Sequence, residues 1–106
     1  MPLLNSVTTP YAEAFLQVAS DMQQTEEIVA EVKGIIQLIN ESPELDKALS
    51  SPILEKESKK NILIELFSEK INQSLLNLMK LLADRQRIGI LVPILERFLE
   101  IYRENS

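Results

Sequence analysis

The 106-residue sequence has no cysteine, no histidine and only two glycines. Without cysteine there are no disulfides and no thiolate metal sites, a composition that fits a reducing compartment. Without histidine the chain lacks the commonest general base, the Ser-His nucleophile pair and the commonest zinc ligand. Gly34 and Gly89 are too few for a glycine-rich phosphate loop. The sequence therefore predicts neither an enzyme nor a bound cofactor or metal.

Long hydrophobic runs and an excess of positive charge are also missing. No apolar run approaches the roughly 20 residues that span a bilayer, and Met1–Thr9 lacks the basic start of a signal peptide. The 11 basic and 16 acidic residues give a formal charge of −5, whereas a nucleic-acid binder needs a basic face. The net charge instead favours a partner segment that carries basic residues. We expect no direct membrane insertion and no nucleic-acid partner.

What the sequence does contain is a series of helix start signals. Thr9-Pro10 predicts an N-cap followed by proline at the first helical position, and Ser42-Pro43 and Ser51-Pro52 repeat this signal. Pro93 is predicted in the first turn of the last helix, where its missing N–H costs little. Each of these positions is read as the beginning of a helix.

The remaining pattern is also helical. Thr25 is predicted to cap a second helix that ends near Asn40, with Gly34 inside it as a close helix-packing point. No segment shows sustained polar–apolar alternation or an Asn-Gly hairpin turn, so strands are not indicated. The sequence predicts an all-α fold, a compact six-helix bundle with two short helices that forms a single domain over residues 1–106.

The segment Leu75–Ile88 is too apolar for an ordinary surface helix. Only Asn77, Lys80 and Asp84 form a polar strip, and the apolar side chains cover an arc of roughly 220°. A stripe of about 100° is enough to face one core. This helix is therefore either central in the bundle or buries a second flank against a partner.

The first helix has a similar surplus, with an apolar arc of roughly 200°. Its Tyr11–Ala14–Val18 edge has a small residue at the centre. The segment Leu75–Ile88, which is the predicted fifth helix, carries an i, i+3, i+7 edge made of Leu78, Leu81 and Arg85. If the two helices are neighbours, these edges form an apolar groove that suits an amphipathic partner helix. The alternative is that both helices are simply central in the core.

Two further points stay open from the pattern alone. The fifth helix has a rival flank made of Leu76, Lys80 and Ala83, and either flank could face a partner. Arg85 and Arg87 follow the helix and read most simply as charges that complement its dipole.

Several motifs, found in order over nearly the whole chain, carry a family resemblance. They are Pro10-Tyr11-Ala12-Glu13-Ala14-Phe15, Leu49-Ser50-Ser51-Pro52, Lys59-Lys60 before Ile62-Leu63, Leu-Leu-Ala-Asp-Arg-Gln-Arg-Ile ending at Ile88, and Leu-Glu-Ile-Tyr-Arg-Glu from Leu99. Together they resemble the N-terminal domain of the F-type ATP synthase delta subunit, the bacterial and chloroplast counterpart of the oligomycin-sensitivity-conferring protein. The fifth-helix motif is most similar to that of cyanobacterial members. The family often has glycine where Gln86 stands.

The resemblance implies a six-helix bundle that acts as a stator component. Such a domain binds the N-terminal helical segments of the alpha subunits on the catalytic head. A C-terminal domain, expected outside this sequence, binds the b-type subunits of the peripheral stalk. The expected location is peripheral, on the cytoplasmic face of the thylakoid or plasma membrane, or on the stromal side in a chloroplast. By motif position the groove residues are Tyr11, Ala14, Val18, Leu78, Leu81, Leu82 and Arg85.

Two rival functions remain beside this one. The first is an acidic helical adaptor or regulatory domain, unrelated to ATP synthase, that binds an amphipathic helix. The second is an enzyme built on glutamate and lysine groups, which would require Lys59, Lys80 or a glutamate to lie buried beside another titratable group.

Overall fold

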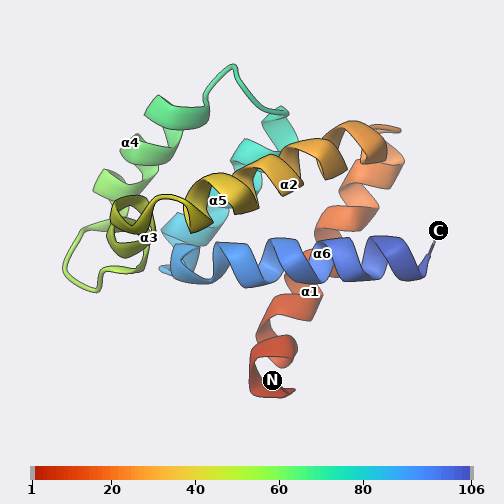
Figure 1. The fold of residues 1–106 in the computed structure, drawn as a ribbon, viewed down its shortest axis with the longest axis horizontal. Coiled ribbons are helices and arrows are strands. Elements are labelled where there is room, and N and C mark those ends of the chain that lie inside the picture. The colour runs from red at the N-terminus through yellow and green to blue at the C-terminus, as the bar shows by residue number, and fades with distance from the viewer. Residues whose placement is uncertain (1, 106) are drawn as a thin grey trace.

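The structure is a computed structural model that describes residues 2–105, with side chains from residue 5 onward. Within this range the chain forms six α-helices and one 3-10 turn and no strand, which confirms the all-α fold class (Figure 1). The elements are α1 (Pro2–Asp21), α2 (Thr25–Asn40), α3 (Pro43–Ser50), α4 (Lys56–Phe67), α5 (Gln73–Asp84), η1 (Ile88–Ile90) and α6 (Leu91–Glu104).

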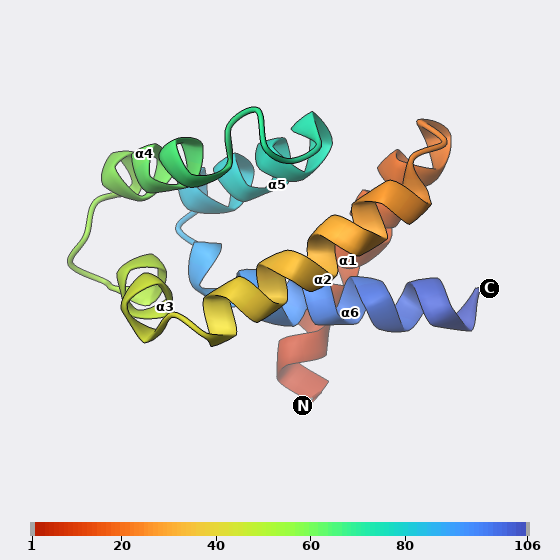
Figure 2. The ribbon, with the colours of Figure 1, turned by 45° about the horizontal axis from the view of Figure 1, so that its top comes forward.

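Helix α6 is the element around which the bundle is organised. Helix α1 crosses α6 and packs closely against it, and α2 also packs against α6 (Figure 1). Helices α4 and α5 form a second closely packed pair, while α3 packs beside η1 (Figure 2). The rings of Phe15 on α1 and Phe98 on α6 meet in the core with their centroids 5.3 Å apart. The first turns of α1 project past α6 in both views.

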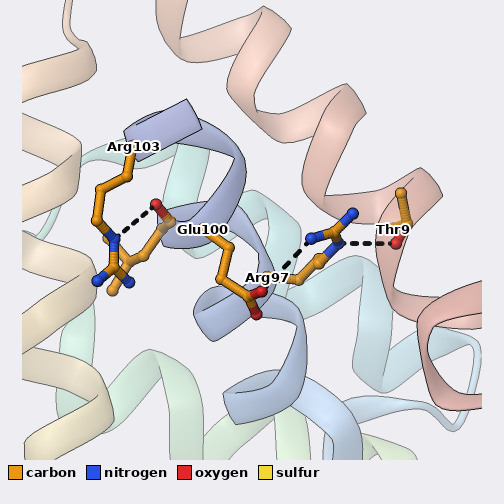
Figure 3. A network of polar contacts seen from close by, with 5 residues as sticks. Thr9, Arg97, Glu100 and Arg103 are labelled. Atoms are coloured by element: carbon orange, nitrogen blue, oxygen red, sulfur yellow. Dashed lines mark hydrogen bonds and ion pairs between the residues drawn. The ribbon is translucent and has the colours of Figure 1, made fainter. Parts of the chain in front are cut away.

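The predicted start at Thr9-Pro10 is wrong, because α1 begins at Pro2 and contains Pro10 in its interior. An interior proline removes one backbone hydrogen bond from the helix. A contact with α6 offsets part of this loss, because Thr9 Oγ1 accepts a hydrogen bond of 3.0 Å from Arg97 Nε (Figure 3). Helix α1 thus continues through Thr9-Pro10, although this pair is a local signal for the start of a helix.

The arginine in that contact belongs to a small polar network along α6. Arg97 Nη1 also lies 3.5 Å from Glu100 Oε2, and Arg103 Nε donates to the backbone carbonyl of Leu99 (Figure 3). Arg97 is consequently half-buried, with one side of its guanidinium on α1 and the other on its own helix. It connects the two helices that form the centre of the bundle.

The other proline signals have mixed outcomes. Pro43 is the first residue of α3, as predicted, and Pro93 lies in the first turn of α6, also as predicted. The Ser51-Pro52 pair ends α3 but does not start the next helix, which begins only at Lys56. Ser51 Oγ accepts backbone N–H groups two and three residues further on, at 3.2 and 3.3 Å, and this turn delays the helix.

Helix α2 ends at Asn40, as predicted, but two details of the prediction are wrong. Thr25 is the first helical residue, with Gln24 in the cap position. Gly34 is exposed, and a Cβ placed on it would meet no heavy atom within 4 Å. It is therefore not a helix-packing point, and nothing in its surroundings requires glycine.

Three helices end in a residue with left-handed backbone geometry, and none of the three is glycine. Gln23, Glu69 and Gln86 have φ angles of 56°, 64° and 58° and follow α1, α4 and α5. After α5, the N–H of Gln86 bonds the carbonyl of Ala83 at 3.0 Å and the N–H of Arg87 bonds that of Leu82 at 2.7 Å, which is a Schellman motif. The turn that glycine ordinarily forms is thus made by glutamine.

Replacing Gly34 with alanine is expected to raise the free energy of unfolding by about 0.5–1 kcal/mol, because alanine loses less backbone entropy in a helix. Urea denaturation followed by circular dichroism measures the change. Gly89→Ala is the control, since its Cβ would lie 3.3 Å from Ser50 Cα and should bring no gain. A Gly34→Ala variant less stable than the parent chain would contradict the open surroundings of this residue.

The two neighbouring threonines of α1 should respond in opposite ways to replacement by valine. Thr8 Oγ1 is buried and has no hydrogen-bond partner among the described residues, so Thr8→Val should raise stability by up to about 1 kcal/mol. Thr9→Val removes the acceptor of Arg97 and should lower stability by about 1 kcal/mol. Thermal unfolding of both variants tests this pair, and equal shifts of the same sign would contradict it.

Candidate partner-helix groove

Helices α1 and α5 meet side by side and run in opposite directions. Near the start of this contact, Tyr11 of α1 lies beside Arg85, which follows the end of α5. At the other end, Ser74 in the first turn of α5 donates a hydrogen bond of 3.1 Å to the sulfur of Met22, just beyond α1. Contacts at both ends fix the two helices as neighbours, which is the condition for a shared groove.

A shallow groove of about 320 Å³ lies between these two helices. It is lined by Tyr11, Ala14, Phe15 and Val18 from α1 and by Ser74, Asn77, Leu78 and Leu81 from α5. We call this surface the α1–α5 groove. It lies on the flanks of α1 and α5 that the core does not cover.

The depth of the groove follows from how far each lining side chain is buried. Phe15 and Leu78 are buried and form its floor. Val18 and Leu81 are 43% and 40% exposed and form its two walls, while Ala14 is exposed on the α1 side. The small side chain of Ala14 leaves room for another backbone to approach. One large apolar side chain on each wall is thus open to solvent.

One residue expected to line the groove, Leu82, does not line it. Leu82 is completely buried in the core and lines no part of the groove, so its expected place in the wall is corrected. The rival flank of α5 is also buried, with Leu76 and Ala83 both in the core. Helix α5 packs closely against α4, and an ion pair of 2.9 Å joins Lys60 to Asp84 across them. The flank that carries Leu76 and Ala83 is therefore buried within the chain and does not form a wall of the groove.

Three lining residues were absent from the sequence-based set. Phe15 was named only within the N-terminal family motif, and Ser74 and Asn77 are polar. The helical spacing could have identified the polar pair, since Ser74, Asn77 and Leu81 fall at i, i+3 and i+7 on one edge of α5.

Arg85 lies at the Tyr11 end of the groove, together with Arg87. Arg85 Nη1 and Arg87 Nη1 donate hydrogen bonds of 3.1 and 2.9 Å to the Tyr11 hydroxyl. Both guanidinium carbons also lie over the phenol ring, 6.0 and 5.9 Å from its centroid. We call these two residues the arginine clamp. The left-handed Gln86 turns the chain between them.

The arginine clamp changes the acidity of the phenol it holds. Partial burial alone would raise the pKa of Tyr11, but the two arginine hydrogen bonds and the two positive charges outweigh it. The net effect is a pKa below the ordinary value of 10.0. Negative charge is thus favoured at the position of the Tyr11 hydroxyl.

Two features of the described residues bear on the rival enzyme hypothesis. No group of three or more acidic residues is placed to hold a metal ion in this part of the chain. Lys59 Nζ donates to the backbone carbonyl of Ser51 at 2.7 Å rather than lying buried beside a titratable group. Among residues 2–105, no helix is both long and apolar enough to cross a membrane.

Replacing Arg87 with glutamine should raise the pKa of Tyr11, because it removes one donor and one positive charge. The phenolate absorption can be titrated in a Tyr102→Phe background, where Tyr11 is the remaining tyrosine. A lowered folded-state pKa adds stability above the ordinary value of 10.0, and this stability is lost as the pH falls through the lowered pKa. An unchanged Tyr11 titration would contradict the clamp geometry. Lys47→Gln, a charge loss on α3, is the control.

Comparison with known proteins identifies the family. A family model described as "ATP synthase delta (OSCP) subunit" matches residues 7–106. The chain is 73% identical over 106 residues to the ATP synthase subunit delta of Prochlorococcus marinus strain AS9601, which covers 100% of the chain and 59% of that relative. It is 60% identical over 105 residues to that of strain NATL2A, which covers 99% of the chain and 58% of that relative. The chain thus spans less than two thirds of the length of these curated relatives.

These matches decide between the functional readings of the sequence. The relatives are cyanobacterial, as the fifth-helix motif predicted, and the unrelated adaptor is excluded. The delta subunit is a structural subunit of ATP synthase, which confirms the expectation of a non-catalytic chain. The chain belongs to the ATP synthase delta (OSCP) subunit family.

Proposed function

We propose that this chain is a stator component of the proton-translocating F-type ATP synthase and that the α1–α5 groove binds the N-terminal helical segments of the alpha subunits. The observation that carries the proposal is the joint exposure of Ala14 and Leu81 across one apolar groove. Membership of the delta family supplies the complex in which such a groove acts.

The groove has the chemistry that an amphipathic helix needs. Its apolar walls are solvent-exposed in the isolated chain, and burial of apolar surface contributes about 25 cal/mol per Å². A few side chains buried on each partner therefore contribute several kcal/mol before the cost of association is subtracted. The floor formed by Phe15 and Leu78 is already buried, so the site is largely pre-formed and little ordering opposes binding.

The role of such a contact is mechanical. A rotor that turns inside the catalytic head exerts torque on it, and the head stays in place only if a stator holds it. We propose that residues 1–106 form the N-terminal domain that grips the head, and that a C-terminal domain outside this sequence binds the b-type subunits of the peripheral stalk. The relatives, of which this chain covers 59%, are long enough for such an arrangement. The proposed location is peripheral, on the cytoplasmic face of the thylakoid or plasma membrane.

A synthetic peptide of the alpha-subunit N-terminal segment should shift the amide NMR signals of α1 and α5 that line the groove. Filling the groove with Ala14→Leu should raise the Kd at least about tenfold, which corresponds to about 1.4 kcal/mol. Ala30→Leu, on an exposed position of α2, is the matched control. Absence of shifts in α1 and α5, or equal affinities of the two variants, would refute the groove assignment.

Shortening a wall residue tests the apolar contribution separately. Leu81→Ala should raise the Kd of the same peptide by about five- to thirtyfold, since a wall anchor loses most of its buried surface. Leu38→Ala on α2 is the control, because Leu38 and Leu81 are 42% and 40% exposed. Isothermal titration calorimetry on both variants gives the comparison. Matching losses from both leucines would show that the effect is unrelated to the groove.

A further inference from the structure

The two arginines of the clamp have no acidic partner among the residues that the structure describes. Other basic side chains of the described chain do pair with carboxylates. Lys60 lies 2.9 Å from Asp84, and Arg97 lies 3.5 Å from Glu100. Arg85 and Arg87 make no ion pair with any described Asp or Glu, although the chain has 16 acidic residues. Both are exposed at the end of the groove.

Their geometry leaves most of their hydrogen-bonding capacity unused. A guanidinium carries five N–H donors in a rigid fork that matches a carboxylate. In the described chain each arginine gives one nitrogen, Nη1, to the single hydroxyl of Tyr11. Two like charges are thus held against one neutral oxygen, and an anion placed between them would relieve their repulsion. The lowered pKa of Tyr11 has the same cause, because the field here favours negative charge.

The opposite end of the groove has a different character. There the lining is Ser74, which donates a hydrogen bond of 3.1 Å to the sulfur of Met22. Cationic side chains therefore lie at one end of the groove, whereas a neutral hydroxyl and a thioether lie at the other. A bound helix with one acidic end would have one favourable direction.

We propose that the arginine clamp binds the carboxylate of an Asp or Glu side chain on the helix that occupies the α1–α5 groove. The inference rests on the proposed function of the groove. It specifies the occupant as an amphipathic helix whose apolar stripe extends about two turns, the distance from Tyr11 to Val18. This helix carries an acidic residue next to its apolar stripe, at the end of the stripe that lies over Tyr11. The clamp fixes the direction of the helix, while the apolar walls supply the affinity.

This specificity differs from what the net charge alone indicates. The formal charge of −5 favours a basic partner, but that field is averaged over the whole surface. Charges that are in contact act over a few ångströms, within the Debye length of about 8 Å at physiological salt. The local pair Arg85 and Arg87 therefore decides which charge is accepted at this end of the groove.

The test is a double-mutant cycle with the alpha-subunit N-terminal peptide and with variants of it in which each acidic residue becomes the corresponding amide. Arg85→Gln and Arg87→Gln should each raise the Kd about two- to fivefold, the range of partly exposed ion pairs, and the double variant about tenfold. These losses should vanish for the peptide whose clamp-facing carboxylate is removed. Lys47→Gln, an equal loss of charge on α3, should leave the Kd unchanged. Circular dichroism checks that every variant stays helical.

The outcomes separate the two proposals. If the parent chain does not bind the unmodified peptide, the proposed function and the clamp both fail. If the parent chain binds but the double arginine variant binds equally well, the clamp is overturned and the groove stands. The clamp is equally overturned if the arginine variants lose the same factor against every amide-substituted peptide. Restored binding between Arg85→Glu, Arg87→Glu and a peptide with lysine at the acidic position would confirm the direct pairing.

Discussion

The packing of α1 against α6 decides which surface of the chain is left for a partner. Phe15 and Phe98 meet in the core, and the fully buried Ala12 and Ala19 lie on the same face of α1 as Phe15. At 100° per residue, Val18 and Ala14 then point roughly 90° and 130° away from the centre of that face. They cannot enter the core while Phe15 occupies it. The exposed α1 wall is thus a geometric consequence of the central helix contact.

Helix α5 completes the groove for a related reason. Its pairing with α4 and the rest of the core buries the flank that carries Leu76 and Ala83. Because the helix is apolar over roughly twice the arc that one core requires, a second apolar flank remains, and Leu81 stands on it. Surplus apolar surface on one helix alone would be a solubility liability. On two antiparallel neighbours it forms a site with two walls and a floor.

The sequence predicts more of the fold than of the site. Apolar periodicity and the Ser42-Pro43 signal identify helices correctly, because these depend on local backbone preferences. Thr9-Pro10 misleads, because the contact of Arg97 with Thr9 is remote in sequence and extends the helix through the proline. The burial of Leu82 depends on how other helices pack against α5, and the apolar periodicity of α5 alone does not contain that information. The Tyr11 contacts with the arginine clamp join residues more than 70 positions apart and leave no local pattern.

An apolar groove by itself does not fix the direction in which a helix binds, since leucine and valine side chains accept an amphipathic helix in either orientation. Partly exposed charges contribute little affinity, but a mismatched charge is repelled and a matched one is not. Placing Arg85 and Arg87 on the rim, held in position by the Tyr11 hydroxyl, adds this discrimination without burying a charge. In the stator contact that we propose, one defined orientation matters as much as strength, because a helix bound in reverse would project its connected chain away from the head.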